Sequence, residues 1–450
     1  MQAHGGMKRK RNLEKPDCRK ATRLKKIILH KETKMEKRRV VITGMGEVTP
    51  LGNSVAETWE AAVAGKSGVG LITHFDATTF KARYAGEVKK FDPANYMNSD
   101  AARKMARFSQ YAVAAAKMAL DDAHLQSHSK EIDNAAVFMG VGIGGFEVLE
   151  DSCIRYSKSA QHRCPPLTIP ELIPNEACGN ICMEFGIHGP AHAITTACSS
   201  GSDAIGDALD LIRSGRRNIA LAGGAESTIN GFGIASFEVL HALSTSFVDE
   251  PQKASRPFDK KREGFVMGEG AAVFVLEEYE SAKARGAKIY AELAGYGSSS
   301  DGYHLTAPNP DGIYGSRAMT EAMMDANVKP SDIHYYNAHG TATQKNDPSE
   351  TQMLKNAFGE DVARALHISS TKSMTGHCLG AAGAIEAMFA VLAIQHNFIP
   401  PTINLDEQDI EGGCDLNYTA NKGIDCKVDC AMSATFGFGG HNGVLVVKRV

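Results

Sequence analysis

The sequence predicts an α/β fold with a largely parallel sheet, built from two related halves. First, short apolar runs typical of buried strands alternate with helical patterns along the chain. Second, glycine makes up 44 of 450 residues, a content typical of chains with many tight turns and close backbone contacts. Third, two pairs of segments resemble each other at nearly equal spacing, which indicates a duplicated unit.

The first half contains four strand patterns and three helical patterns. The strand patterns lie at residues 39–44, 135–140, 193–197 and 218–223. The helical patterns lie at residues 53–65, 105–122 and 199–214. In the last of these, Ile205, Leu209 and Ile212 share one apolar stripe, and Gly215 follows as a typical C-terminal stop.

The second half repeats these patterns. Residues 268–276 and 440–448 each combine a glycine turn with an apolar strand. The helical pattern after Cys198 aligns with the one after His377 at an offset of 180 residues. This duplication predicts two copies of one α/β unit, with a boundary near the strand pattern at residues 288–294.

Charge is unevenly distributed along the chain. Residues 1–39 hold 15 Lys and Arg against 4 Asp and Glu, a net charge of +11, whereas the remaining residues hold 34 against 48, a net charge of −14. This favours a basic, disordered extension over residues 1–36, followed by halves at residues 37–287 and 288–450. A nucleic-acid enzyme usually carries positive charge on the fold itself, so we expect no nucleic-acid partner.

Composition also bears on the compartment. The longest apolar stretch, residues 378–394, contains Glu386 and is too short to span a bilayer without charge, so we expect no membrane insertion. The ten cysteines lack the spacing of a zinc site or a disulfide framework. We therefore expect no metal and a bacterial-type cytoplasmic location, with an organellar location as the alternative if residues 1–36 act as a targeting segment.

A glycine-rich turn at residues 140–145 (GVGIGG) matches the dinucleotide-binding fingerprint and follows a strand pattern. No second strand ending in an acidic residue follows about 20 positions later, as that fingerprint requires. A dinucleotide-dependent oxidoreductase is therefore the weaker alternative function.

The most informative position is Cys198, where an apolar strand pattern runs into cysteine and then into a helix. Backbone N–H groups at a helix N-terminus favour a thiolate and can bind an oxyanion. Two segments, residues 335–343 and 371–377, end strand patterns in polar turns that carry His339 and His377. Such turns are where α/β folds present reactive groups.

Two further features accompany these residues. Glu386 is the only charge in an apolar, small-residue helix, so its burial requires a partner, and Lys372 is the nearest candidate. The glycine-dense loop at residues 433–442 holds Phe436 and Phe438, either of which could fill an apolar cavity. We expect the ion pair to fix the turn that carries His377.

Four motifs occur in a fixed order: TACSSG at 196–201, NAHGTAT at 337–343, STKSMTGHxLGAAG at 370–383 and FGFGGxN at 436–442. Together they resemble the β-ketoacyl-acyl-carrier-protein synthases of the second type, which are condensing enzymes of fatty-acid synthesis with a thiolase fold. The resemblance runs from about residue 37 to residue 450. It implies that the two halves stack as a layered αβαβα sandwich.

The resemblance implies roles for the reactive side chains. Cys198 would accept an acyl chain from acyl carrier protein, and His339 and His377 would act on the malonyl thioester. Neutral imidazole N–H groups suit this step because they stabilise the enolate that forms as CO₂ leaves. Lys372 and Glu386 would hold the histidines and set their protonation. No cofactor is implied, because the substrates are carried on the phosphopantetheine of the carrier protein.

Other residues would contact the substrate. The oxyanion of acyl transfer would be bound by the amides of Cys198 and Phe436, and Phe436 would gate the acyl pocket. Four further side chains would bind the pantetheine arm or line the pocket: Thr341, Thr343, Phe237 and Phe438.

The resemblance also implies a homodimer that docks an acidic carrier protein on Arg103 and Lys104. The chain departs from the family pattern at His441, Ala434 and His241, which affects the glycine loop and carrier docking. A ketosynthase of a polyketide-like pathway remains an alternative. A non-enzymatic alternative is an idle partner subunit, or a nucleic-acid binder that uses residues 1–39.

Overall fold

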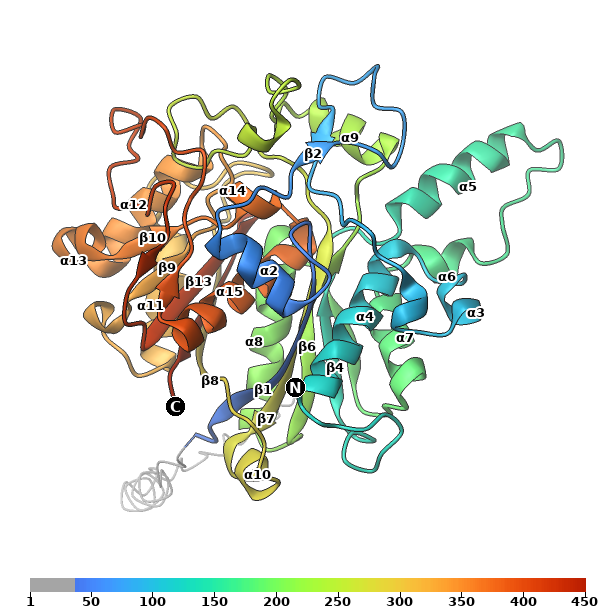
Figure 1. Cartoon of the computed structure of the whole chain (residues 1–450), viewed down its shortest axis with the longest axis horizontal. Coiled ribbons are helices and arrows are strands. Elements are labelled where there is room, and N and C mark those ends of the chain that lie inside the picture. The colour runs from blue at the N-terminus through green and yellow to red at the C-terminus, as the bar shows by residue number, and fades with distance from the viewer. Residues whose placement is uncertain (1–36) are drawn as a thin grey trace, which may run out of the picture. The chain divides into compact units, whose positions relative to one another are not determined.

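The computed structural model describes residues 37–450, and Arg38–Val450 form one compact unit (Figure 1). The predicted basic extension at residues 1–36 lies outside the described residues. Ten strands of the described chain join one sheet in the order β10-β9-β13-β14-β8-β1-β7-β6-β4-β5. These strands are β1 (Val40–Val48), β4 (Ala136–Gly140), β5 (Ala191–Ile194), β6 (Ile219–Glu226), β7 (Gly270–Glu278), β8 (Ala291–Ser300), β9 (Tyr335–Asn337), β10 (His367–Ser369), β13 (Cys430–Gly437) and β14 (His441–Lys448).

The sheet consists of two halves with the same strand order. In the first half β5, β4, β6, β7 and β1 follow one another, and in the second half β10, β9, β13, β14 and β8 do the same. The glycine-led strands found by sequence comparison are β7 and β14, which occupy equivalent places. The halves meet in a short antiparallel pairing of β1 with β8, where Val41 lies opposite Glu292 and Ile42 opposite Ala291. The predicted duplication is confirmed.

The sheet is mixed rather than largely parallel, which corrects the prediction from sequence. The pairs of β4 with β5 and β6, and of β9 with β10 and β13, are parallel. The pairs that include β1, β7, β8 or β14 are antiparallel. A strand buried on both faces reads as an apolar run in either direction, so composition does not reveal its orientation.

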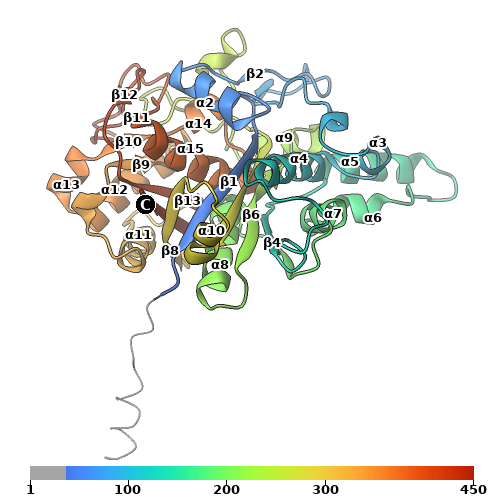
Figure 2. The same ribbon diagram turned by 60° about the horizontal axis from the view of Figure 1, so that its bottom comes forward.

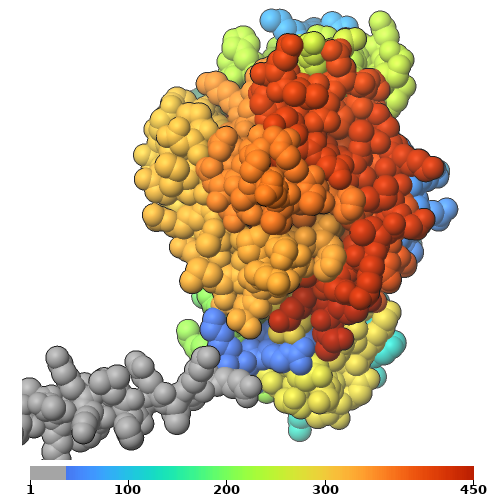
Figure 3. Space-filling model, turned by 90° about the vertical axis from the view of Figure 1, so that its left-hand side faces the viewer, coloured from blue at the N-terminus to red at the C-terminus, as the bar shows by residue number. Residues whose placement is uncertain are grey.

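Helices cover both faces of each half. α8 (Ser200–Arg213) and α15 (Ala382–His396) pack against each other between the halves, as Figures 1 and 2 show. α4 (Arg107–Asp122) and α7 (Glu176–Phe185) pack on the outer face of the first half, and α11 (Ile313–Asp325) and α12 (Asn346–Phe358) cover the second. Figure 3 views this second half, whose orange and red surface hides the sheet. The predicted αβαβα layering is confirmed.

Strand β7 shows how sequence produces these layers. Ala272, Phe274 and Leu276 face the core that contains α8 and α15, whereas Val273 and Val275 face the core beneath α4. Successive side chains of a strand point to opposite faces, so an unbroken apolar run fills two cores at once.

The central helix α15 is apolar on all sides. The segment Leu379–His396 is long and apolar enough to span a membrane by composition, yet 89% of it is buried inside the fold. A helix that is hydrophobic all round is the core helix of a protein when other elements surround it. α15 is such a core helix.

The remaining elements are mostly short. The helices are α2 (Val55–Val63), α3 (Ser99–Ala102), α5 (Phe146–Lys158), α6 (Thr168–Leu172), α9 (Gly231–Glu238), α10 (Tyr279–Ala284), α13 (Glu360–Ala365) and α14 (Lys372–Thr375). Two small strand pairs are β2 (Gly70–Leu71) with β3 (Tyr84–Ala85), and β11 (Phe398–Ile399) with β12 (Ile424–Asp425). The 3-10 turns are η1 (Pro93–Asn95), η2 (Ala197–Ser199), η3 (Pro251–Lys253), η4 (Pro330–Asp332) and η5 (Leu379–Ala381). Three of these elements, α14, η2 and η5, lie in the interior.

Candidate active site

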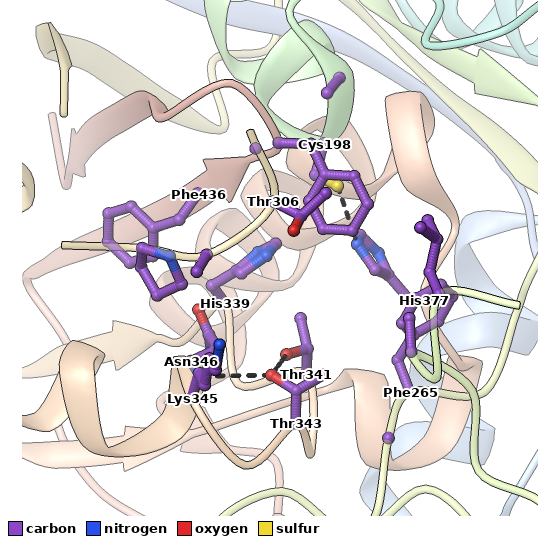
Figure 4. Close-up of a pocket in the computed structure, with 18 of the residues that line it drawn as sticks. Cys198, Phe265, Thr306, His339, Thr341, Thr343, Lys345, Asn346, His377 and Phe436 are labelled. Atoms are coloured by element: carbon purple, nitrogen blue, oxygen red, sulfur yellow. Dashed lines mark hydrogen bonds between the residues drawn. The ribbon is translucent and has the colours of Figure 1, made fainter. Parts of the chain in front are cut away.

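Three chain segments bring Cys198, His339 and His377 together. Cys198 lies in η2, which runs directly into α8. His339 follows strand β9, and His377 lies between α14 and η5, just before α15. The first half supplies the cysteine and the second half supplies both histidines. They come close together because α8 and α15 are neighbours in the middle layer. Figure 4 shows the three side chains converging.

The three side chains share one buried chamber. The Cys198 sulfur is 3.1 Å from Nε2 of His377, and the two imidazole rings meet edge to face with centroids 5.2 Å apart. The exposed fractions of Cys198, His339 and His377 are 8%, 2% and 3%. Their ligating atoms lie within 4.8 Å of one another, so by distance this set could also hold a soft metal ion.

The chamber opens into a cavity of about 410 Å³. Eight residues singled out by sequence line this cavity: Cys198, His339, His377, Thr341, Thr343, Phe237, Phe436 and Phe438. The hydroxyls of Thr341 and Thr343 are 3.0 Å apart at one wall. Phenylalanine rings form much of the remaining wall. The cavity therefore has polar surface suited to a thioester and apolar surface suited to an acyl chain.

The backbone fixes the proton position of His377. Its Nδ1 accepts a hydrogen bond of 3.3 Å from the Leu379 N–H, so Nε2 carries the ring proton and faces the cysteine. Burial lowers the pKa of His377 well below its usual 6.5, and the nearby charge of Lys372 adds to this effect. The imidazole is therefore neutral at pH 7 and presents an N–H donor to the chamber.

His339 is neutral for the same reasons. Burial, then the charge of Lys372, lowers its pKa well below 6.5. Lys372 Nζ is 3.3 Å from Nδ1 of His339, so the ammonium donates to Nδ1 and leaves the proton on Nε2. The backbone N–H of His339 donates to Glu350 over 2.7 Å, which holds the turn.

The predicted ion pair between Lys372 and Glu386 is present. Both side chains are buried, so Glu386 does not extend to water. Burial raises the pKa of Glu386 to about 7, and the charge of Lys372 opposes that shift. The pair places a compensated cation beside His339 at the base of the chamber.

Two family descriptions match the chain in sequence. The N-terminal domain of β-ketoacyl synthases matches residues 37–282, and the C-terminal domain matches residues 290–406. The chain belongs to the β-ketoacyl synthase family. The resemblance drawn from the four motifs is thus confirmed, together with the thiolase-like fold and the predicted class of condensing enzyme.

Curated relatives of this synthase family are highly similar over their whole length. The 3-oxoacyl-[acyl-carrier-protein] synthase 2 of Vibrio harveyi is 47% identical over 416 residues, which cover 92% of this chain and 100% of that protein. The enzyme of the same name from Synechocystis is 46% identical over 415 residues, covering 92% and 99%.

Solved structures of ketosynthases match closely as well. A β-ketoacyl synthase from Burkholderia phymatum has a TM-score of 0.85 at 38% identity, and the ishigamide ketosynthase/chain length factor has 0.84 at 36%. A type II PKS ketosynthase solved with its acyl-carrier protein and a bound hexaketide has 0.82 at 35%. Each match covers 92% of this chain and 100% of the solved chain.

The Cys198 sulfur of this β-ketoacyl synthase is a thiol at rest. Burial raises its pKa to about 12, although the Lys372 charge and the Phe438 backbone N–H lower it in part. This loss of hydration opposes the helix N-terminus, which is expected to favour a thiolate. The preceding residue, Ala197, has a φ of +52°, so the backbone is strained next to the nucleophile.

The amide that bonds to the sulfur is that of Phe438, a residue expected from sequence only to contact the substrate. The Phe438 N–H donates to the Cys198 thiol, whereas Phe436 lies inside β13 in register with Asn442. Strand β13 ends at Gly437, so the amide of Phe438 is free of the ladder and that of Phe436 lies within it. The Phe436 ring packs edge to face on His339 with centroids 5.7 Å apart, and it is almost fully buried.

The backbone N–H groups of the glycine-rich turn at residues 140–145 are bonded within the chain, so they are not available to a nucleotide. The N–H groups of Gly142, Ile143 and Gly144 donate to the carboxylate of Glu226 at 2.9 to 3.2 Å. These are the donors that a dinucleotide phosphate would need. Sequence reasoning did not single out Glu226, although it lies in AGGAES at residues 222–227, a segment that also resembles the family.

Sequence analysis also missed the segment after β8, which fixes the position of the glycine-dense loop at residues 433–442. Asp301 accepts from the Asn442 amide over 2.8 Å, and its own N–H donates to Gly440. The Gly439 N–H donates to the carbonyl of Leu305, and the three residues after Leu305 line the cavity. The loop is therefore tied down by residues that follow β8.

The positions that depart from the family pattern differ in how deeply they are buried. Ala434 is fully buried in β13, and His441 begins β14 opposite Ser300 and Gly437. His241 lines the cavity and has a φ of +53°. Arg103 and Lys104 are exposed at the end of α3, where Arg103 pairs with Asp100, so their docking role stays a prediction.

Proposed function

We propose that this chain is the condensing enzyme of fatty-acid elongation, which joins an acyl group to a malonyl unit carried on acyl carrier protein. The observation that carries the proposal is the chamber itself: one cysteine sulfur and two neutral imidazole N–H donors face a common cavity. The products are a 3-oxoacyl chain on its carrier, CO₂ and free carrier protein.

In the first half-reaction the acyl chain moves to Cys198. The sulfur attacks the thioester carbonyl, and the N–H groups of Cys198 and Phe438 donate to its oxygen as negative charge develops there. The bond to the pantetheine sulfur then breaks. The cysteine proton leaves with that sulfur, which yields an acylated Cys198 and a free carrier thiol.

In the second half-reaction the malonyl thioester loses CO₂. The bond between its carboxylate and its α-carbon breaks, and the electron pair moves onto the thioester oxygen as an enolate. Nε2–H of His339 and of His377 donate to that oxygen, and they bind it most strongly when it carries charge. The α-carbon then attacks the acyl carbonyl, and the Cys198 sulfur leaves as a thiolate that takes up a proton from solvent.

Lys372 and Glu386 support this step without touching the reacting carbons. The ammonium occupies Nδ1 of His339, so the ring cannot shift its proton away from the chamber. Glu386 compensates the cation at a place where both side chains are almost fully buried. Their role is to keep the donor atoms in place and neutral.

Acyl carrier protein is the proposed partner. Thr341 and Thr343 line the cavity and would bind the pantetheine arm, while Phe237 would contact the acyl chain. Arg103 and Lys104 would attract the acidic carrier, and His241 offers a weaker contact than an arginine would. The Vibrio relative is named for acyl carrier protein, which supports this assignment.

We further infer a homodimer and a bacterial-type cytoplasmic location, with halves divided after residue 287. The sheet ends at β5, whose outer edge has no partner strand among the described residues.

The organellar alternative depends on residues 1–36, which lie outside the described residues. A polyketide role has support from the ishigamide and hexaketide ketosynthases, but at 35–36% identity against 46–47% for the fatty-acid enzymes.

The two half-reactions can be tested separately with a Cys198→Gln variant. It should form no 3-oxoacyl product, because no sulfur accepts the chain, and should still release CO₂ from malonyl carrier protein. His339→Ala and His377→Ala should each lower CO₂ release by about 10²-fold or more. Labelled CO₂ and product chromatography measure the two outcomes.

A matched control is Cys430→Ala, which removes a buried thiol at the far end of β13. It should elongate chains at the rate of the natural sequence. Elongation by the Cys198→Gln variant would contradict the nucleophile assignment, and normal CO₂ release by both histidine variants would contradict the enolate-stabilising role.

A further inference from the structure

Glu226 is a fully buried carboxylate that the reaction above does not use. It is the last residue of β6, and none of its surface is exposed. Oε2 accepts from the N–H groups of Gly142 at 2.9 Å and of Gly380 at 3.2 Å, and Oε1 accepts from Gly144 at 3.2 Å. Among the described residues, no lysine or arginine pairs with it. Backbone N–H groups therefore supply the hydrogen bonds of this carboxylate, and they oppose the burial that raises its pKa to about 7.

These donors come from two turns that are far apart in sequence. Gly142 and Gly144 belong to the turn after β4, and Gly380 belongs to η5, which precedes α15. A Cβ on Gly380 would lie 2.2 Å from the Gly142 nitrogen, so the two turns pack backbone against backbone. Only glycine at both positions permits this close contact of the two turns. This requirement accounts for the glycine-rich motif that resembles a nucleotide site.

Both turns contribute to the active cavity. Gly142, Ile143 and Leu379 line it. Leu379 precedes Gly380, and its N–H is the donor that holds the proton of His377 on Nε2. A single carboxylate thus fixes a cavity wall from the first half and the orientation of a catalytic histidine from the second.

We propose that Glu226 is a positioning residue of the condensation reaction, whose carboxylate binds the two turns together and thereby holds His377 and the cavity wall at Ile143 in their working positions. The proposal rests on the proposed function for its kinetic consequences. Its structural consequence, the tautomer of His377, does not depend on that function.

Glu226→Gln tests the proposal with an almost isosteric change. Both carboxylate oxygens accept N–H donors, so either orientation of the amide places its NH₂ against donors. The turns should separate, and CO₂ release from malonyl carrier protein should fall by about 10- to 100-fold. Acylation of Cys198 should change by less than about threefold, because that step does not use the N–H of His377.

Glu277→Gln is the matched control. Glu277 is also fully buried with its carboxylate bound, in this case by Arg285 and Thr43, but it lies at the opposite end of β7 from the cavity. Both variants lose hydrogen bonds of a buried carboxylate, so both should lose thermal stability. Only Glu226→Gln should lose decarboxylation, and equal rates in the two variants would overturn the proposal.

Nitrogen NMR of His377 supplies a readout that requires no turnover. The natural sequence should show Nε2 protonated, and Glu226→Gln should show a mixture of tautomers as the Leu379 N–H moves. An unchanged tautomer in the folded variant would overturn the proposal. Failure of the natural sequence to release CO₂ would instead count against the proposed function.

If Glu226→Gln does not fold, Glu226→Asp replaces it. The shorter carboxylate keeps its charge but cannot reach both turns at once. We expect a folded variant with a CO₂ release rate between those of the natural sequence and the His377→Ala variant. A rate equal to that of the natural sequence would overturn the proposal.

Discussion

Two imidazoles and one cation lie in and beside the same buried chamber, and their protonation states decide the chemistry. Lys372 lies 3.3 Å from Nδ1 of His339, close enough to repel a proton on that ring. Burial acts in the same direction on His339 and His377. Both rings are therefore donors through one N–H each, which is the form that stabilises an enolate rather than protonating it.

This neutrality makes stability depend on pH in a defined direction. In the unfolded chain both imidazoles take up a proton near pH 6.5, whereas in the folded chain their pKa values lie well below that. These two imidazoles therefore bind protons preferentially in the unfolded state, and their contribution to the free energy of unfolding should fall as the pH drops below about 6.5. The expected slope is up to about 1.4 kcal/mol per pH unit for each imidazole.

Urea unfolding between pH 7.5 and 5 measures this effect. A His339→Gln/His377→Gln double variant lacks both groups and should lose stability with a shallower slope than the natural sequence. Identical slopes for the two proteins would show that the buried histidines are protonated in the folded state.

The reactive residues could be predicted from sequence because each lies in a short motif with its own turn chemistry. Cys198, His339 and His377 are such residues, and Glu386 was predictable as a lone charge in an apolar helix. The choice between the amides of Phe436 and Phe438 as the proposed oxyanion donor was not, because it depends on where β13 leaves its ladder. That end point is set by pairing with β14 rather than by local sequence.

At the level of elements, close backbone packing positions the nucleophile. Strand β4 ends at Gly140, where an added Cβ would lie 2.2 Å from the backbone of Ser200 at the start of α8. Gly140→Ala should therefore push α8 away from the sheet. We expect the free energy of unfolding to fall by about 1–3 kcal/mol and acylation of Cys198 to slow.

Gly70→Ala is the control for this substitution, because nothing lies within 4 Å of a Cβ at that position. Its stability should stay the same or rise slightly as the unfolded chain loses freedom. Chemical denaturation of both variants measures the difference. Equal stabilities would mean that α8 accommodates the extra methyl group and that its packing does not fix Cys198.

The duplicated unit was predictable, but the sheet direction was not. β7 and β14 carry a repeated glycine-led pattern, and α8 and α15 follow equivalent turns, so sequence comparison found both pairs. Antiparallel β7 and β14 are as apolar as the parallel strands, since helices cover both faces of the sheet. The glycine turn at residues 140–145 misled for a related reason: a buried carboxylate and a phosphate require the same N–H donors.

At the scale of the whole molecule, the sheet has an open edge. β5 bonds to β4 through Pro190 and Ile194, so the alternate residue Ala193 directs its N–H and carbonyl outward. Met183 on the adjoining helix α7 is 68% exposed. An unpaired edge beside exposed apolar surface favours pairing with a second copy.

Analytical ultracentrifugation should therefore give twice the mass of one chain. Ala193→Pro removes only an outward N–H, so it should produce folded monomers. A monomeric mass for the natural sequence, or an unchanged dimer in this variant, would contradict pairing through β5.

The central claim is that Cys198 carries the acyl chain during elongation. Incubation with acyl carrier thioesters of several lengths, followed by proteolysis and mass spectrometry, tests it directly. We predict that the acyl mass appears on the peptide containing Cys198 and disappears when malonyl carrier protein is added. Turnover with the acyl group on another residue, or with Cys198 unmodified throughout, would contradict the account.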